Sequence, residues 1–297
     1  MSAAPAASSA ATPTVHVAPI GEGDVDEVAR FLHDTLNDKV SVEAWARTIV
    51  PPWEVPAPNH GFLLRAQGRV VGAYLALYSE RAVDGVPRRF CNLAAWCVAE
   101  PYRTQGLRLV RAVLRQPGYE FTDFSPSGNV VELNRRLGFD ALDTTTALVP
   151  TLPIPGRARG TRLVARPAEL ERALDESSLR VYRDHRHPWG VIHLALQNSE
   201  GTCYVIARKE RRKGLPLFAS IVHVSDQRVF RRGAPAVYRH LLVRHGALVT
   251  LAELRVVGER PALAVLQRAP RPRMFRSHDL SASAIDYLYS EVTCVSW

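Results

Sequence analysis

The sequence has few cysteines, only two methionines and no long apolar run. Its four cysteines, Cys91, Cys97, Cys203 and Cys294, form no C-x-x-C pair, and four scattered thiols do not make a disulfide framework in a chain of 297 residues. Arginine or histidine interrupts each apolar stretch well short of the roughly 20 residues that a membrane span needs. These absences favour a soluble protein of the reducing cytoplasm, without a membrane segment.

Several catalytic and ligand-binding signatures are also missing. The sequence has no G-x-S-x-G nucleophile elbow, no H-E-x-x-H zinc motif, no G-x-x-x-x-G-K-[ST] phosphate loop and no G-x-G-x-x-G. His185, His187 and His193 have a spacing that could hold a metal, but no cysteine or carboxylate ligand pattern accompanies them. We therefore predict no metal cofactor, and we expect the segment 185–193 to be a loop packed beside an acceptor site.

Positive charge is concentrated in the second half of the chain. Residues 1–155 carry 14 basic against 16 acidic side chains, whereas residues 156–297 carry 24 against 13, so the second half supplies all of the net charge of +9. Such an excess attracts anionic partners. Because no zinc-finger, RNP or basic-zipper pattern accompanies it, we do not expect nucleic acid as a partner. An anionic small molecule or an acidic acyl-carrier protein suits the charge better.

The chain length and its 46% of hydrophobic residues fit two domains. Residues 1–13 are rich in alanine, serine and proline and lack a basic start, which predicts a disordered tail and not a signal peptide. The segment 151–160 contains the prolines and glycines that are typical of a linker. We predict one α/β domain at 14–150 and a second at 161–297.

The first half shows the hydrophobic periodicity of alternating strands and helices, in the order β-α-α-β-β-β-α-β-α-β. The predicted elements are a strand at 15–20, helices from 23 and at 41–50, strands at 62–66, 70–78 and 90–98, a helix at 107–115, a strand at 120–124, a helix from 129 to 138 and a strand at 142–149. The strand that ends at 98 turns through Arg103-Thr104-Gln105-Gly106 into its helix. Because free N–H groups and the helix dipole meet at such a turn, it predicts an anion site.

This order and two short motifs resemble the GNAT superfamily of acyl-CoA-dependent N-acyltransferases. The donor-binding motif of that family, Gln/Arg-x-x-Gly-x-Gly/Ala, stands here as Arg103-Thr104-Gln105-Gly106-Leu107-Arg108. The second signature is an Asn that opens the next helix and a Gly-Phe that closes it, matched by Asn129 and Gly138-Phe139. The resemblance covers about residues 14–150 and implies a GNAT-like fold, a mixed central sheet flanked by helices.

The resemblance also implies that acetyl-CoA is the acyl donor. The CoA pyrophosphate would lie on backbone N–H groups of about 104–108, and the pantetheine arm would pair with strand edges where 90–98 and 120–124 separate. Arg108 replaces the usual small residue of the motif, so its guanidinium would either crowd the phosphate or contact it. The donor-binding residues that the resemblance implies are Trp96, Cys97, Val98, Arg103, Thr104, Gln105, Gly106, Leu107, Arg108 and Asn129.

Transfer to an amine needs a group that takes the amine proton and a group that protonates the departing thiolate. Asp123 ends the strand 120–124 where some relatives have a Glu base, although an Asp there can equally cap the following turn. Asn134 occupies the position where many relatives carry a tyrosine acid, and an amide cannot act as an acid at neutral pH. Asp123 and Asn134 are the candidate catalytic residues, and the source of the thiolate proton stays open.

The second half repeats the pattern of strand, charged loop, helix and strand that 90–124 shows. Its predicted elements are a largely helical 163–179, strands at 202–209 and 217–224, a helix at 235–244 and a strand at 248–257. The charged segment 227–233 lies where a donor loop would be, but no donor motif survives in it. We therefore predict two tandem GNAT-like domains, of which the second is degenerate and binds the acceptor or a partner. We expect 208–213 to be an exposed hairpin loop and 268–276 a solvated connector.

Together these observations favour an N-acetyltransferase that moves an acetyl group from CoA to an amine of a small-molecule acceptor. Amino sugars, aminoglycoside-like compounds and amino acids all fit the acceptor. A second hypothesis is a noncatalytic acyl-CoA-binding or regulatory protein, because Asn134 stands in the acid position. Two others are an acyltransferase that uses an acyl-carrier-protein thioester and a polyanion-binding role for the basic half.

Overall fold

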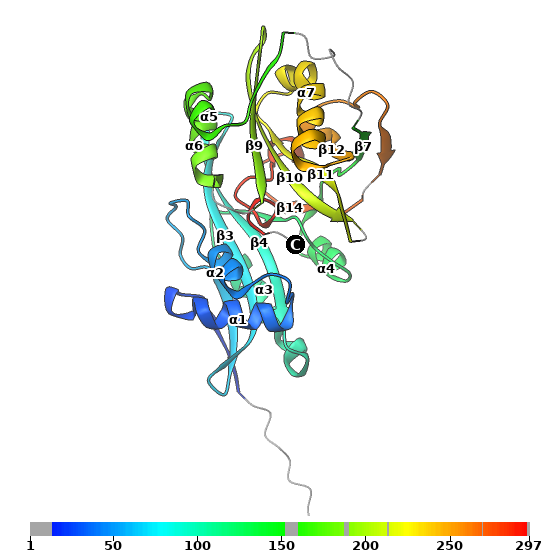
Figure 1. Ribbon diagram of the computed structural model, residues 1–297. Helices are drawn as coiled ribbons and strands as arrows, with labels where there is room; N and C mark the ends of the chain where they lie inside the picture. Colours follow the sequence, from blue (N-terminus) through cyan, green and yellow to red (C-terminus); the bar gives the residue numbers. More distant parts are fainter. Residues whose placement is uncertain (1–13, 152–159, 187–189, 213, 269, 296–297) are drawn as a thin grey trace, which may run out of the picture.

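The structure is a computed structural model that describes residues 14–151, 160–186, 190–212, 214–268 and 270–295. Two seven-stranded sheets lie one above the other, each with helices packed on it (Figure 1). The predicted tail, 1–13, and most of the predicted linker lie outside the described residues. Within the described ranges, none of the helices has the length and apolar character needed to span a bilayer.

The first sheet has the order β1-β2-β3-β4-β5-β14-β6, and every neighbouring pair is antiparallel except β4 and β5, which are parallel. Its strands are β1 (Val15–Pro19), β2 (Gly61–Ala66), β3 (Arg69–Val83), β4 (Val86–Val98), β5 (Glu120–Asp123), β6 (Asp140–Ala141) and β14 (Met274–Arg276). Its helices are α1 (Val25–Thr35), α2 (Val42–Ile49), α3 (Gly106–Leu114) and α4 (Val130–Arg136), with 3-10 turns at Glu22–Asp24 and Glu100–Gln105.

Helices cover both faces of this sheet, and the long strand β3 shows why. Successive side chains of a strand point to opposite faces. Ala73 and Leu75 pack in one buried cluster with α1 and α2, while Tyr74 and Ala76 pack in another with α3. Because both faces are buried, β3 is a continuous apolar run and not an alternating one.

The second sheet has the order β13-β7-β12-β11-β10-β9-β8, again with one parallel pair, β11 and β12. Its strands are β7 (Thr146–Pro150), β8 (Arg162–Val164), β9 (Val191–Asn198), β10 (Gly201–Arg212), β11 (Leu215–Val224), β12 (Val249–Glu253) and β13 (Val265–Gln267). The helices of this half are α5 (Pro167–Ala173), α6 (Glu176–His185), α7 (Gln227–His245), α8 (Leu254–Val257) and α9 (Glu291–Cys294), with a 3-10 turn at Ala282–Ala284.

The two sheets repeat each other strand by strand. In each, four antiparallel strands lead through a helix to a parallel partner, as β4-α3-β5 in the first sheet and β11-α7-β12 in the second. In each sheet, the strand beside this parallel partner comes from the other half of the chain. β14 of the second half lies beside β5, and β7 of the first half lies beside β12. The mixed α/β fold with a repeated strand order is therefore confirmed. The domain limits 14–150 and 161–297 stay a prediction. Each sheet contains one strand from the other side of these limits, β7 in the second sheet and β14 in the first.

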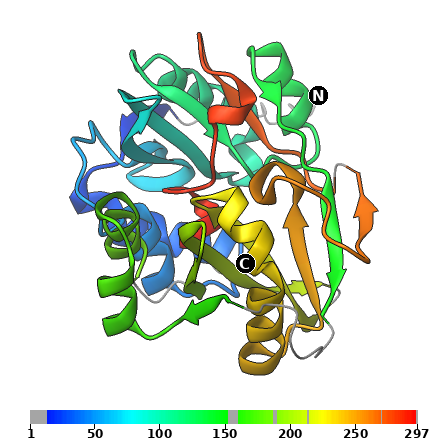
Figure 2. The same cartoon turned by 90° about the horizontal axis from the view of Figure 1, so that it is seen from above.

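The C-terminal segment 285–295 lies in the core that the two sheets share. Seen from above, this red segment runs between the first and the second sheet (Figure 2). Its residues are buried except for the half-buried Asp286, and its apolar members pack in the same cluster as residues of α1, α2 and α6. The end of the chain is thus part of the interior.

Four expectations for the second half are wrong. The segment 208–213 is not an exposed loop, because residues 208–212 are the end of β10 and Arg208 is half-buried. The segment 268–276 is not a solvated connector, because Met274 and Phe275 are 0% and 5% exposed and form β14. Met274 and Phe275 are the only apolar residues of this short strand, which pairs with the short strands β5 and β6. The arginines on either side of them hide the apolar pattern of a strand in the sequence. The segment 227–233 is not a loop but the start of α7, because the carboxylate of Asp226 accepts the N–H groups of the first turn. The predicted helix 163–179 is β8 followed by α5 and the start of α6.

Candidate active site between the two sheets

The parallel strands β4 and β5 lie side by side over only four residue pairs, from Phe90 and Glu120 to Leu93 and Asp123. Beyond Leu93, two residues of β4 face one residue of β3, and Ala95 within this bulge has a φ of 52°. A bulge bends its strand. Among the described residues, the edge 94–98 has a strand neighbour on one side only.

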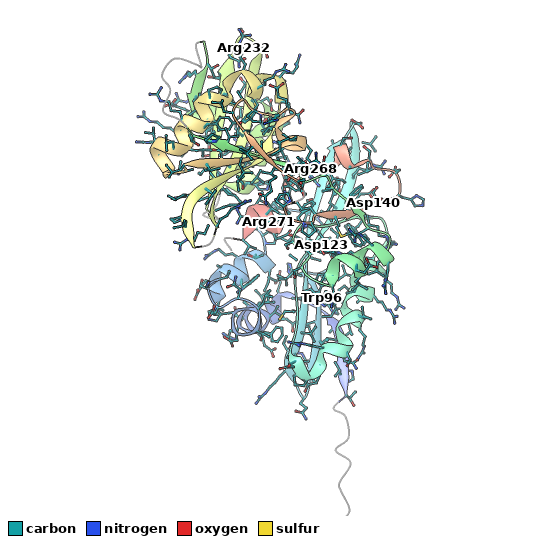
Figure 3. The ribbon with its side chains drawn as sticks, turned by 90° about the vertical axis from the view of Figure 1, so that its right-hand side faces the viewer. Trp96, Asp123, Asp140, Arg232, Arg268 and Arg271 are labelled. Carbon is teal, nitrogen blue, oxygen red and sulfur yellow. The ribbon has the colours of Figure 1, made fainter. Side chains whose placement is uncertain are left out.

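A cavity of about 440 Å³ opens where the two strands separate. The end of β4, the turn after β5, β10, the segment 271–273 and α9 line it, so both halves of the chain contribute. Figure 3 shows Trp96, Asp123 and Arg271 one after another from the first half of the chain toward the second. The predicted position of the gap is thus the position of a cavity.

Asp123 and Asn134, the two predicted catalytic residues, lie in direct contact. The Nδ2 of Asn134 donates a hydrogen bond to Oδ2 of Asp123 at 2.8 Å, and the N–H of Ser125 donates to Oδ1 at 3.3 Å. Burial raises the pKa of Asp123 to about 6, against the opposing effect of these hydrogen bonds. Asn134 therefore holds the Asp123 carboxylate, and both oxygens of Asp123 have donors.

Glu291, at the start of α9, is a second buried carboxylate on the cavity wall. Its Oε1 accepts a hydrogen bond from the Ser125 hydroxyl at 2.8 Å, while its buried Oε2 has no hydrogen-bond partner among the described residues. Burial, and next the charge of Asp123, raise the pKa of Glu291 to about 7. Sequence reasoning missed this residue. The one available signal was a single acidic residue inside the otherwise uncharged run 287–295.

Asn92 fixes the position of Glu291. This buried side chain of β4 donates to the Thr122 hydroxyl of β5 at 3.1 Å, so it bridges the two strands just before they separate. Its Oδ1 accepts the backbone N–H of Glu291 at 3.1 Å. The start of α9 is therefore attached to the end of the paired region.

Tyr74 lines the same cavity from β3. Its ring stacks on that of Trp96, with 5.5 Å between the ring centroids, and its side chain is 3% exposed. Its hydroxyl makes no hydrogen bond to any part of the chain that the structure describes. Burial first, and then the charges of Asp123 and Glu291, raise the pKa of Tyr74 well above its ordinary value of 10. The hydroxyl thus keeps its proton at neutral pH.

The predicted donor turn lies at the far end of β4. Gly106 packs so closely against this strand that a Cβ would be 3.2 Å from the Trp96 ring and 3.4 Å from a Val98 methyl group. The turn before it, Glu100–Gln105, is a 3-10 helix, and the N–H of Gly106 donates to the Arg103 carbonyl. The run of free N–H groups expected at 104–108 therefore lacks at least this one.

The other predicted donor-binding residues are spread over the surface and the core. Arg108 donates to the Val15 carbonyl at 2.8 Å and to Oε1 of Gln105 at 3.1 Å, so its guanidinium is bound within the protein. Cys97 packs in the buried cluster shared by both sheets, and burial raises its pKa to about 11. The residues on the surface are Arg103, Thr104, Leu107 and Asn129, and Gln105 is half-buried.

The histidines of 185–193 are hydrogen-bonded inside the protein. His185 accepts the N–H of Tyr289 at Nε2 and bonds to the Val181 carbonyl through Nδ1, and His193 bonds to the Tyr204 hydroxyl. His187 lies outside the described residues. Within the described part of the chain, no three His, Cys, Asp or Glu side chains are grouped so that they could hold a metal ion.

Solved structures with the same arrangement are described as acyltransferases. A GCN5-related N-acetyltransferase from Anabaena variabilis matches with a TM-score of 0.60 and 11% identity, over 89% of this chain and 72% of that one. A GCN5-related N-acetyltransferase from Kribbella flavida matches with a TM-score of 0.57 and 16% identity, over 89% of this chain and 71% of that one. A probable N-acyltransferase from Enterococcus faecalis matches with a TM-score of 0.57 and 13% identity, over 88% of this chain and 72% of that one. No family model and no curated protein sequence matches the chain.

Proposed function

We propose that this chain, which has the GNAT fold in both of its halves, is an N-acyltransferase that uses acetyl-CoA and acylates a small-molecule amine. The observation that carries the proposal is the unpartnered Oε2 of Glu291 on the wall of the cavity where β4 and β5 separate. The free edge of β4, along which a thioester can lie, and the buried carboxylate of Glu291 therefore face the same cavity.

The donor would lie along the free edge of β4, 94–98. Its pantetheine amides would pair with the backbone groups of this edge, as an added strand does. The pyrophosphate would lie at the N-terminus of α3, where the helix dipole favours negative charge. Gly106 supports this position, because its missing side chain lets α3 approach β4. Acyl-CoA supplies the activated carbonyl, and the protein supplies the groups around it.

Glu291 is the proposed general base. A base is most effective when its pKa lies near the working pH, and the pKa of Glu291 is about 7. Its Oε2 is available to accept the proton of an incoming amine. Asp123, the base expected from the sequence, already has a donor on each oxygen. The charge of Asp123 instead raises the pKa of Glu291.

Tyr74 is the proposed acid in place of the tyrosine that Asn134 replaces. In the transfer step the amine nitrogen attacks the thioester carbonyl carbon, so a C–N bond forms and the C–S bond breaks. The amine proton passes to Oε2 of Glu291, and the departing thiolate takes the proton of the Tyr74 hydroxyl. The Tyr74 hydroxyl is protonated at neutral pH, so its proton is present when the thiolate forms.

The test is incubation of the full chain with acetyl-CoA and a panel of primary amines, scored by free-thiol release and by the mass of the product. Calorimetry measures CoA binding in the same preparation. Transfer that Glu291→Gln abolishes without loss of CoA binding is the expected result. CoA binding without thiol release on any amine overturns the proposal and favours a noncatalytic acyl-CoA-binding protein. An acyl-carrier-protein thioester in place of acetyl-CoA tests the alternative donor.

A further inference from the structure

Three arginines from the second half line the cavity that contains Glu291. Arg208 comes from β10, and Arg271 and Arg273 come from the segment before β14. Two of them have carboxylate partners, because Arg273 pairs with Glu253 at 3.2 Å and Arg271 pairs with Glu210 at 3.5 Å. These arginines belong to the predicted hairpin loop and connector, which the sequence indicated only as sources of positive charge that suits an anionic acceptor.

Arg208 differs from the other two. Its guanidinium donates to the backbone carbonyl of Val292 at 2.5 Å, and no carboxylate of the described chain lies within 4.0 Å of it. An arginine keeps its charge in a protein, and a charge withdrawn from water is costly without a counter-ion. Burial lowers the pKa of Arg208, and the charges of Glu210 and Glu291 oppose this only from beyond ion-pair distance. The cavity wall therefore holds one half-buried guanidinium without a direct carboxylate partner in the described chain.

The position of this charge relates it to the proposed chemistry. Val292, which binds the Arg208 guanidinium, directly follows Glu291 in the chain. A ligand that faces the Glu291 carboxylate with its amine can therefore reach Arg208 with a group only a few bonds away. An arginine fork matches a carboxylate in shape and charge. One guanidinium without a direct carboxylate partner, near the charges of Glu210 and Glu291, fits a singly charged carboxylate better than a phosphate with two negative charges.

We propose that Arg208 forms a carboxylate subsite, so that the acceptor is an amino acid or another small amine that carries a carboxylate close to its nitrogen. This inference rests on the proposed function, because it takes Glu291 as the group that faces the amine. The Arg208 subsite selects the acceptor, and Glu291 and Tyr74 act on it.

The test compares amino acids with the amines that lack only the carboxylate. Suitable pairs are L-phenylalanine with 2-phenylethylamine, L-leucine with 3-methylbutylamine and L-lysine with cadaverine. We expect the wild-type protein to prefer the amino acid of a pair at least tenfold in kcat/KM, since a hydrogen bond to a charged group contributes about that much. Arg208→Gln should lower kcat/KM for the amino acid about tenfold or more and for its matched amine less than about threefold.

Two further variants separate a ligand contact from a structural effect. Arg208→Lys keeps the charge and should restore part of the preference. Arg232→Gln is the matched control, because Arg232 pairs with Glu200 on the surface of α7, far from Asp123 and Arg271 in Figure 3. Arg232→Gln should leave kcat/KM unchanged for both members of each pair. If Arg208→Gln lowers kcat/KM equally for the amino acid and its matched amine, Arg208 is structural and the inference is overturned.

The remaining outcomes distinguish this inference from the proposed function. Transfer to the amines as fast as to the amino acids overturns the subsite and leaves the acyltransferase. If no amine of either kind is acylated, the proposed function fails, and binding then decides the subsite. Calorimetry with CoA present should show the amino acids binding the wild type at least tenfold more tightly than Arg208→Gln. Equal binding to both proteins overturns the subsite.

Discussion

Replacing Glu291 with glutamine should stabilise the folded protein at alkaline pH while it removes the proposed base. Burial raises the pKa of Glu291 from 4.5 to about 7. Each pH unit of such a rise corresponds to about 1.4 kcal/mol, so the ionised side chain costs the fold about 3 kcal/mol. The side chain is 0% exposed, so solvent does not screen this cost. Glutamine has the same shape and no charge to ionise.

The sign of the pH dependence follows from linkage. Between about pH 4.5 and 7 the folded chain holds a proton on Glu291 that the unfolded chain has lost. The contribution of Glu291 to the free energy of unfolding of the wild type therefore falls as pH rises through this window and levels off above it. Because Asp123 titrates beside Glu291, the two share this dependence, and the gain expected from Glu291→Gln at high pH is about 1–3 kcal/mol.

Urea unfolding followed by circular dichroism, at about pH 5 and about pH 8, measures this difference. The control is Glu259→Gln, which removes the same charge from a surface pair with Arg231 at 3.3 Å. It should change the free energy of unfolding by less than about 0.5 kcal/mol at both pH values. If the difference in the free energy of unfolding between wild type and Glu291→Gln is the same at both pH values, the pKa of Glu291 is not raised in the folded protein, which refutes the prediction.

Three further predictions concern the site. Tyr74→Phe should lower kcat about 10- to 100-fold without changing the CoA affinity measured by calorimetry, because only the proton donor is lost; an unchanged kcat contradicts this role. Gly106→Ala should weaken CoA binding, because its Cβ would lie 3.2 Å from the Trp96 ring and that ring must shift; titrations with CoA check this, and an unchanged affinity contradicts it. Arg108→Ala should change CoA affinity no more than about fivefold, because its guanidinium is already bound to Val15 and Gln105, and a larger loss would mean that Arg108 contacts the donor.

The first half could be predicted from the sequence because its elements depend on local patterns. The expected helix at 107–115 is α3 at 106–114, and the expected strand at 120–124 is β5 at 120–123. Apolar periodicity and turn residues decide such elements within a few neighbouring positions. The gap between β4 and β5 followed from the resemblance, and the structure adds the bulge at Ala95 that accompanies it.

The rest of the site depends on contacts between distant residues. Ser125 and Glu291 are 166 positions apart and are joined by a hydrogen bond. Strands of three residues such as β14 are too short to show a period. Arg208 belongs to a charged run that looks solvated, and only the fold shows that its guanidinium reaches α9. Local patterns carry no information about these pairings, so the proposed base and the carboxylate subsite were both missed.

The repeated sheets also explain why one donor site is expected and not two. The gap between β11 and β12 in the second sheet corresponds to the gap between β4 and β5, but its cavity is only about 30 Å³. Glu253 closes it, because this buried carboxylate pairs with Arg255 and Arg273 at 3.2 Å each and accepts the Tyr287 hydroxyl. A pantetheine arm could enter there only by separating two ion pairs from their buried partner, which is strongly unfavourable. The second half has thus filled its own gap, and one of the residues that fill it, Tyr287, belongs to the same C-terminal segment 285–295 that brings Glu291 to the first.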